Sequence, residues 1–329
     1  MQKFLFLMGF LLLYSVNTNG QTCCSGGIPL SNSIGLPIEN QGAWQFSLSY
    51  DYNRLNTLLS GSDRLDDDSR LRITQSLLFN TGYTITNNLS VEFLLTYVNQ
   101  KREINQFGNT NLDETYGIGD AVLLFKYNFN NIFGGSNTLR LGAGPKIPFG
   151  ATDKRNDNGI LLNPDLQPGS GAWDLILWST YLQSFDFRPS GTFAGSLIYR
   201  HTGTNNNYFN NTTTYRFGSE FQAFLNYTDQ FVISKTLIDP GLGVKYRQAG
   251  NDEIAGAPLE NTGGKWVNLV PSLNIHLSKK LLLISKAELP VYNYVEGTQL
   301  TPTYRITAGL FLTLSKKGKN ELQNLNNEL

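Results

Sequence analysis

The strongest candidate for covalent chemistry in this sequence is the triplet His276-Leu277-Ser278, where a base and a hydroxyl stand two residues apart. A nucleophilic serine needs a histidine within hydrogen-bond reach and a third group that orients the histidine. Ile275 and Leu277 are the apolar residues of an alternating segment, so His276 and Ser278 share the opposite face, beside a short turn. This position gives an esterase little support, and we expect no catalytic residue and no enzymatic activity.

Two further patterns resemble ligand sites. Gly142-Ala143-Gly144-Pro145-Lys146 is glycine-rich like a phosphate-binding loop, but Pro145 removes a backbone donor and the Gly-Lys-Ser/Thr ending is absent. The acidic run at 63–68 could offer carboxylate oxygens to a divalent cation, but we favour a solvated loop. The sequence therefore predicts no metal site and no cofactor.

The only cysteines are the neighbours Cys23 and Cys24. Adjacent residues cannot clamp distant segments together, so a disulfide framework across the fold is excluded. Three interpretations stay open: a solvent-exposed pair, a lipid-modified cysteine, or a contact with a soft metal. We favour the first, because two neighbouring thiolates do not complete a metal site.

Composition narrows the class of protein. The chain has 329 residues and a formal net charge of zero, so no nucleic acid or other polyanion is expected as a partner. Charged residues make up 16%, against roughly a quarter in ordinary soluble domains. The mean hydropathy is nevertheless −0.24, which argues against helical membrane spans.

The N-terminus has the layout of a secretory signal peptide. Lys3 precedes an apolar run at 4–14, and small and polar residues follow. This run is too short for a membrane-spanning helix of about twenty residues. We predict a signal peptide over 1–20, an N-terminal periplasmic segment with the two cysteines over 21–42, a barrel over 43–314 and a C-terminal periplasmic tail over 315–329.

From Gly42 onward, apolar residues recur with a period of two, which indicates β-strands. In one example Ala121, Leu123 and Phe125 alternate with residues of the other face. The alternation predicts about twelve strands, many near the roughly 9 to 11 residues that cross a bilayer. These segments are 44–52, 71–79, 89–97, 121–129, 139–143, 173–181, 193–199, 215–227, 242–246, 269–277, 281–289 and 304–312.

Long and short connections alternate between these segments. The long ones are 53–69, 99–115, 150–170, 202–214, 248–265 and 293–303, and the short ones are 86–88, 130–136, 186–191, 228–230 and 278–280. This alternation is typical of a Gram-negative outer-membrane barrel, with long loops outside the cell and short turns in the periplasm. A soluble β-sandwich would have to expose the second strand face to water, and that face is mixed here. We therefore predict an all-β fold, a transmembrane antiparallel barrel.

If one face of each strand contacts lipid, the other faces the lumen. The polar residues on that face are predicted to line it: Asp120, Lys126, Asn128, Arg140, Lys146, Asp174, Arg200, Arg216, Glu220, Gln222, Lys245, Arg247, Lys286, Glu288 and Arg305. Cations outnumber acids in this set, which suggests a narrow polar lumen that prefers anionic or polar solutes. For any one residue, pairing across strands is the alternative. Apolar solutes stay open because apolar residues share this face: Ile118, Val122, Leu124, Ile176, Trp178 and Ile198.

Short glycine motifs give the chain a resemblance to a known family. Gly117-Ile118-Gly119-Asp120 opens one strand, and the next ends in the run Leu141 to Gly150, with the letters LGAGPKIPFG. Gly169-Ser170-Gly171 before Trp173-Asp174 and Pro240-Gly241-Leu242-Gly243 are similar in kind. Over roughly 44–314 the sequence resembles the outer-membrane barrel family of the MetA-pathway of phenol degradation. The resemblance implies a barrel that passes small hydrophobic or aromatic molecules.

We expect an outer-membrane channel or transporter for small molecules, in contact with lipid, a small-molecule solute and the barrel-assembly machinery. Barrels of this class usually finish on an aromatic residue that the assembly machinery reads, whereas here 315–329 follow the last strand. A structural or adhesin-type barrel is the main alternative. An outer-membrane phospholipase-like esterase, built on His276 and Ser278, is the second.

Overall fold

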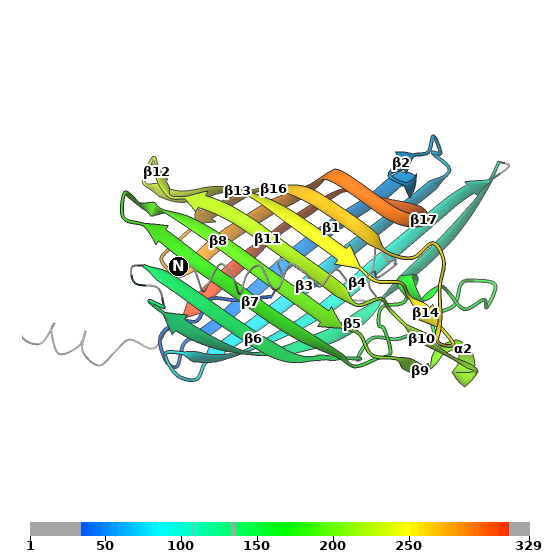
Figure 1. Cartoon of the computed structure of the whole chain (residues 1–329), viewed down its shortest axis with the longest axis horizontal. Coiled ribbons are helices and arrows are strands. Elements are labelled where there is room, and N and C mark those ends of the chain that lie inside the picture. The colour runs from blue at the N-terminus through cyan, green and yellow to red at the C-terminus, as the bar shows by residue number, and fades with distance from the viewer. Residues whose placement is uncertain (1–33, 107, 133, 135, 316–329) are drawn as a thin grey trace, which may run out of the picture.

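Long antiparallel strands wind around a common axis in the computed structural model, which describes residues 34–315 except 107, 133 and 135 (Figure 1). The long strands are β1 (Trp44–Gly61), β3 (Arg70–Thr84), β4 (Leu89–Gln106), β5 (Asn109–Asn130), β6 (Asn137–Ile147), β7 (Asp174–Phe185), β8 (Arg188–His201), β11 (Glu220–Asp229), β13 (Thr236–Ala249), β16 (Gly264–His276) and β17 (Leu281–Leu314). They pair in the order β11-β8-β7-β6-β5-β4-β3-β1-β17-β16-β13, and β11 also pairs with β13. The sheet therefore closes into a barrel without free edges, and the predicted fold class is confirmed.

The last element, β17, forms two passes of the wall. Its first part pairs with β16 and its second with β1, and the Thr313 N–H donates to the Lys280 carbonyl at 2.9 Å. The chain turns back near Gly297, whose φ of +66° suits a glycine. With these two legs the wall has twelve passes, as the alternation predicts. The long loop expected at 293–303 is instead the tip of this hairpin.

The smaller elements gather mainly at one end of the barrel. β9 (Asn205–Asn207), β10 (Thr213–Arg216), β14 (Glu253–Ile254) and β15 (Ala257–Pro258) form a second sheet beside helix α2 (Tyr208–Asn211). Figure 1 shows them at the end opposite the N label, here called the loop end. β2 (Asp63–Arg64) pairs with β1, β12 (Phe231–Ile233) pairs with β13, and η1 (Pro164–Leu166) is one turn of 3₁₀ helix.

The wall strand expected over 215–227 begins only at Glu220. Tyr215 and Phe217, expected to face lipid, are 5% and 3% exposed. The chain departs from the wall at Gly218, where any side chain would collide with the backbone of Gly250. The prediction was therefore wrong here, because alternation continues through a change of direction that only a glycine permits.

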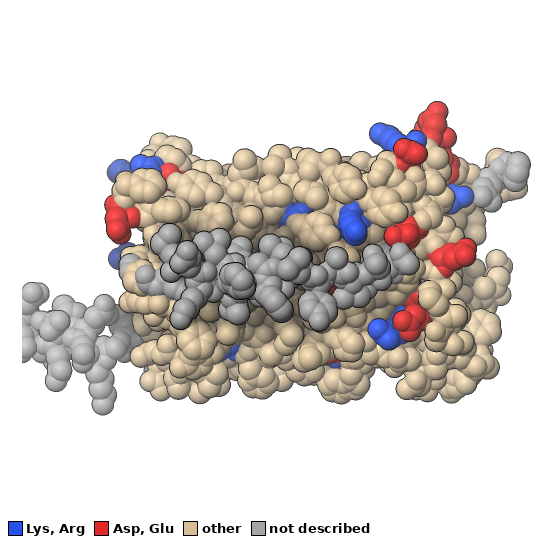
Figure 2. Space-filling model, viewed as in Figure 1, with Lys and Arg blue, Asp and Glu red and all other residues tan. Residues whose placement is uncertain are grey.

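The strands alternate between an exposed apolar face and a buried face. Leu77, Phe79, Tyr97, Phe125 and Tyr127 are each at least 41% exposed, as expected of side chains that contact lipid. Figure 2 shows most visible charged side chains toward the two ends and largely uncharged surface between them. Among the described residues, no helix is long and apolar enough to cross a membrane.

A bulge in β5 changes which residues face inward. Leu95 of β4 pairs with Ala121 and Tyr97 with Ile118, so one extra residue lies in β5 between these pairs. An extra residue reverses the alternation on one side of the bulge. Ile118, predicted to face the lumen, is 54% exposed, while Ala121, predicted to face lipid, is fully buried.

The long connection at 148–173, expected outside the cell, folds partly into the barrel at the loop end. Leu166 and Gln167 are 1% exposed. The Thr115 hydroxyl donates to the Leu166 carbonyl, and the Gln100 amide donates to the Gln167 carbonyl at 3.3 Å. This connection therefore narrows the loop end of the lumen from inside.

Candidate functional site in the barrel lumen

The inner segment, residues 34–37, lies inside the barrel. The N–H groups of Gly35 and Leu36 donate to the Glu92 carboxylate at 2.9 to 3.1 Å. Lys126 forms an ion pair with Glu92 at 2.7 Å and donates to the Leu36 carbonyl. This differs from the predicted periplasmic segment over 21–42, because buried charges on β4 and β5 hold the backbone of the inner segment. Cys23 and Cys24 lie outside the described residues.

An apolar cluster surrounds the same segment. Its buried members come from the inner segment and five strands: Ile34, Leu78, Leu94, Val122, Leu124, Ile176, Trp178 and Ile198. Gly35 has a φ of +101°, and a Cβ there would lie 2.5 Å from the Trp178 ring. The segment therefore needs glycine at this point for both its backbone conformation and its approach to Trp178.

A connected set of buried charges crosses β5, β6, β7 and β8. Lys146 pairs with Asp120 at 2.7 Å and with Asp174 at 3.1 Å. Asp120 also accepts the N–H of Gly150 at 3.1 Å and both the N–H and the hydroxyl of Ser170 at 3.0 and 2.7 Å. Asp120 thus joins two strands to the connection at 148–173 and is occupied by partners of the chain itself.

Arg200 extends this set on β8. Its Nε lies 3.1 Å from a carboxylate oxygen of Asp174, and its side chain is fully buried. Within the described part of the chain, its Nη1 and Nη2 atoms have no hydrogen-bond partner. A buried guanidinium with unused donors is costly, so Arg200 is held by charge rather than by a complete set of hydrogen bonds.

A second set of charges continues around the ring on β11, β13, β17 and β1, next to Arg200, whose register partner is Glu220. Lys245 pairs with Glu288 at 3.0 Å, and Arg305 pairs with Asp51 at 2.8 Å. Arg247 pairs with Glu220 at 2.8 Å and stacks 4.6 Å from the centre of the Trp266 ring.

Three more of the predicted residues have identified contacts. Asn128 accepts a hydrogen bond from Arg140 at 3.0 Å, and Gln222 donates to Glu220. Arg216, predicted to line the lumen from a wall strand over 215–227, lies instead on β10 in the small sheet, 3.5 Å from Glu253.

Sequence reasoning missed two inward carboxylates. Glu92 and Asp51 are 1% and 2% exposed, and each pairs with a predicted cation. Both occupy positions on the polar face of an alternating segment, and this pattern could have identified them. Their presence lowers the cationic excess that the sequence suggested.

Two cavities lie beside the inner segment, toward the end with the short turns. One of about 330 Å³ has Arg140, Lys286 and polar side chains of β7, β8 and β16 in its lining. The other, of about 260 Å³, is lined by Lys286, by the polar residues Ser47, Ser49, Asn80 and Thr307, and by apolar residues. Among the described lining residues of both there are cations but no carboxylates. The lining of these two cavities therefore carries more positive than negative side chains, as the sequence suggested for the whole lumen.

At the loop end, Asp252 is a buried carboxyl outside the wall strands. It accepts the Tyr215 hydroxyl and the Gly218 N–H at 2.8 Å, while its own N–H donates to Thr262 at 3.1 Å. Burial raises the pKa of Asp252 to about 7, because the charged form loses its hydration. The same burial, together with the nearby Asp252, raises the pKa of Tyr215. This pair ties the connection after β13 to the connection before β11.

The hydrogen bonds of His276 and Ser278 do not join them. His276 lies 2.8 Å from a carboxylate oxygen of Asp239, and the Ser278 hydroxyl oxygen accepts the N–H groups of Lys280 and Leu281 in the turn. The described residues also contain no group of three or more His, Cys, Asp and Glu that could hold a metal ion.

Comparisons with known proteins agree with this architecture. The chain is similar to an outer membrane channel from Pseudomonas putida F1 in its crystal structure, with 16% identity, a TM-score of 0.66, and coverage of 87% of this chain and 100% of that one. The beta domain of the Bordetella autotransporter BrkA is a weaker likeness, with 12% identity, a TM-score of 0.45, and coverage of 84% and 100%. Among curated proteins, none matches the sequence.

The family model described as putative MetA-pathway of phenol degradation matches residues 60–306. This match covers most of the closed barrel, including the Gly119-Asp120 strand and every member of the two sets of buried charges except Asp51. The barrel is located in the outer membrane. The chain therefore belongs to the putative MetA-pathway of phenol degradation family.

Proposed function

We propose that this protein is an outer-membrane channel for passive passage of small molecules through a narrow lumen. The observation that carries the proposal is the pair of cavities beside the inner segment, of about 330 and 260 Å³. Spaces of this size on the inner side of a closed barrel fit solutes of a few to a dozen heavy atoms. The family description and the likeness to the Pseudomonas putida outer membrane channel support the same class of function.

The cavity walls suggest which solutes pass. Trp178 and Ile198 offer apolar contact to hydrophobic or aromatic bodies, while Arg140 and Lys286 offer positive charge. We propose that the channel accepts small hydrophobic or aromatic molecules and favours anionic over cationic ones. The phenol named in the family description is one aromatic molecule of this size.

Current through the purified full-length chain in a planar bilayer tests this proposal. In a potassium chloride gradient, the reversal potential should show a preference for the anion. Lys286→Gln should lower the anion-to-cation permeability ratio roughly two- to fivefold, because one unit charge beside the path is removed. Lys279→Gln is the matched control, since Lys279 is exposed and is not among the lining residues of either cavity.

Two results would contradict the proposal in different ways. A cation preference in the wild type would contradict the proposal that Arg140 and Lys286 set the charge of the conduction path. Absence of current from both the wild type and Glu92→Gln, which loosens the inner segment, would favour a structural or adhesin-type barrel.

A further inference from the structure

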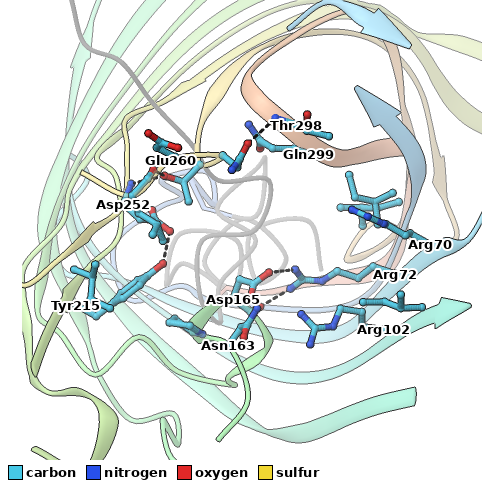
Figure 3. A pocket seen from close by; sticks show the side chains of 18 of the residues that line it. Arg70, Arg72, Arg102, Asn163, Asp165, Tyr215, Asp252, Glu260, Thr298 and Gln299 are labelled. Carbon is cyan, nitrogen blue, oxygen red and sulfur yellow. Dashed lines mark hydrogen bonds and ion pairs between the residues drawn. The ribbon is translucent and has the colours of Figure 1, made fainter. Parts of the chain in front are cut away.

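A third cavity, the mouth cavity, lies at the loop end and has a volume of about 490 Å³. Its lining comes from β3, β4, η1, α2, the connection between β13 and β16, and the tip of β17. In Figure 3 the labelled arginines stand on one side, and Tyr215, Asp252 and Glu260 stand on the other. The mouth cavity is therefore bipolar.

The arginine side is an unusual arrangement of like charges. Arg72 of β3 pairs directly with Arg102 of β4, and Arg70 is two residues away on the same strand face. Like charges directly opposite each other on a sheet are destabilising. Carboxylates offset this cost, because each arginine has its own: Asp67 lies 3.4 Å from Arg70, Asp165 2.5 Å from Arg72 and Asp113 2.6 Å from Arg102.

Hydrogen-bonding capacity remains on this side. The buried Nε atom of Arg102 has no hydrogen-bond partner within the part of the chain that the structure describes, and the Nε atom of Arg70 has only the ion-pair contact with Asp67 at 3.4 Å. A guanidinium has five N–H donors in a fork that fits a carboxylate. Arg70 keeps 42% of its side chain exposed, so an incoming anion can reach it.

Carboxylates also line the mouth cavity, but most are already engaged. Glu103 pairs with Lys101 at 2.8 Å, Asp165 with Arg72 at 2.5 Å, and Asp252 accepts donors of Tyr215 and Gly218. Glu260 is exposed at the rim. The acidic side therefore offers oxygen acceptors for a hydroxyl, while the arginine side offers donors for an anion.

The mouth cavity is also lined by apolar and aromatic side chains. Tyr208 lies 5.1 Å from Tyr215, measured between ring centres. The aliphatic side chains of the lining are Leu55, Leu71, Ile104, Ile254, Leu259 and Leu300. An apolar body with a polar group at each end would match a cavity with these apolar side chains and with polar groups on two sides.

We propose that the mouth cavity binds a small aromatic hydroxy acid. Its carboxylate lies against Arg70 and Arg102, its ring against Tyr208 and the aliphatic lining, and its hydroxyl points toward the acidic side. If the protein is a channel as proposed above, a ligand of this site belongs to the class of solutes that the channel transports, so this inference rests on the proposed function. Binding itself does not require conduction, so the two can fail separately.

Equilibrium dialysis of the full-length protein in detergent tests the proposal, with 4-hydroxybenzoate, benzoate, phenol and 4-hydroxybenzylammonium as probes. We expect 4-hydroxybenzoate to bind most tightly, benzoate next, and phenol and the cation about tenfold more weakly or worse, since they lack the charge-assisted bonds. Arg70→Gln/Arg102→Gln should weaken 4-hydroxybenzoate about tenfold and leave phenol unchanged. Arg64→Gln is the matched control, because Arg64 is exposed on β2 and does not line the mouth cavity.

Arg70→Gln alone keeps the experiment decisive if the double variant does not fold, since Arg70 is the most exposed of the three arginines and has the longest ion pair. It should weaken 4-hydroxybenzoate roughly threefold. Equal binding of 4-hydroxybenzoate and 4-hydroxybenzylammonium, or an equal loss in Arg64→Gln, would overturn the proposal. Binding without any conductance would leave this site standing and remove the channel function instead.

Discussion

The two halves of the inner wall differ in how much apolar surface they present to the inner segment. On β3, β4, β5, β7 and β8, the inward side chains include a continuous apolar cluster that packs against Ile34. On β13, β16, β17 and β1, the inward side chains are mainly polar, with the ion pairs of Lys245 with Glu288 and Arg305 with Asp51. Both halves contain buried ion pairs, such as Glu92 with Lys126 in the first half, but the apolar cluster that contacts the inner segment lies on the first half.

This difference explains where the inner segment lies and where space remains. Ile34 gains the free energy of apolar burial only on the first half, while the Glu92–Lys126 pair supplies charged partners for its backbone. The cavities of about 330 and 260 Å³ border the second half, since Lys286 and Thr307 line both. A solute that passes the inner segment would therefore follow the polar half.

The largest effect is expected from Glu92→Gln, compared with Glu288→Gln in the polar half. Each change removes one partner of a buried ion pair, of Lys126 or of Lys245, which should cost about 3–5 kcal/mol in the free energy of unfolding. Only Glu92→Gln also removes the carboxylate that holds the N–H groups of Gly35 and Leu36. Unfolding in denaturant should show both losses, whereas single-channel conductance should rise in Glu92→Gln alone.

An equal rise of conductance in Glu288→Gln would contradict the division of the wall into two halves. Adding Lys126→Met to Glu92→Gln removes the uncompensated charge. This double variant should regain part of the lost stability while the conductance stays high.

A smaller effect is expected from Gly35→Ala, compared with Gly42→Ala. Both glycines have positive φ, +101° and +80°, so both alanines carry backbone strain. Only at Gly35 does the new Cβ meet the Trp178 ring, whereas at Gly42 nothing lies within 4 Å. Overpacking costs about 1–3 kcal/mol, and this should displace the inner segment and raise conductance less than Glu92→Gln does. Equal conductance in the two alanine variants would show that contact with Trp178 does not hold the segment.

The smallest effect on the barrel is expected from pH, because the group concerned lies outside both halves. Burial raises the pKa of Asp252 to about 7, against about 3.9 in an unfolded chain. The folded state therefore binds the proton more tightly, so stability at this site is highest below about pH 4, falls as the pH rises toward 7 and is constant above that. Asp252→Asn should abolish this dependence.

Hydrogen exchange of the Gly218 amide, which donates to Asp252 at 2.8 Å, measures this effect. After correction for intrinsic exchange, protection should decline between about pH 4 and 7 in the wild type and stay level in Asp252→Asn. The same decline in both proteins would exclude Asp252 as its source.

The fold could be predicted because alternation and connection length are local properties of the chain. The segment from Phe125 to Phe129 already separates into an exposed apolar side and a buried polar side without knowledge of its neighbours. The prediction failed where local geometry changes the period, at the bulge that turns Ile118 outward and at Gly218, where the chain leaves the wall.

The candidate site was less predictable, because it depends on partners far apart in the chain. The alternating pattern predicts that Asp120 and Lys146 both face the lumen, but their ion pair depends on the register between β5 and β6. Asp252 and Tyr215 lie on different loops, and their hydrogen bond has no counterpart in any sequence pattern.

By itself, the sequence determined a closed barrel with an apolar exterior and polar residues on the inward face of its strands. The reason is that a period of two gives each strand two faces, one that contacts lipid and one that faces the lumen. Only the tertiary structure decided what fills the interior. The inner segment, the connection at 148–173 and the mouth cavity are placed by contacts between distant residues such as Gly35 with Glu92 and Arg72 with Asp165. Such contacts depend on how strands align around a ring, and local periodicity carries no information about that alignment.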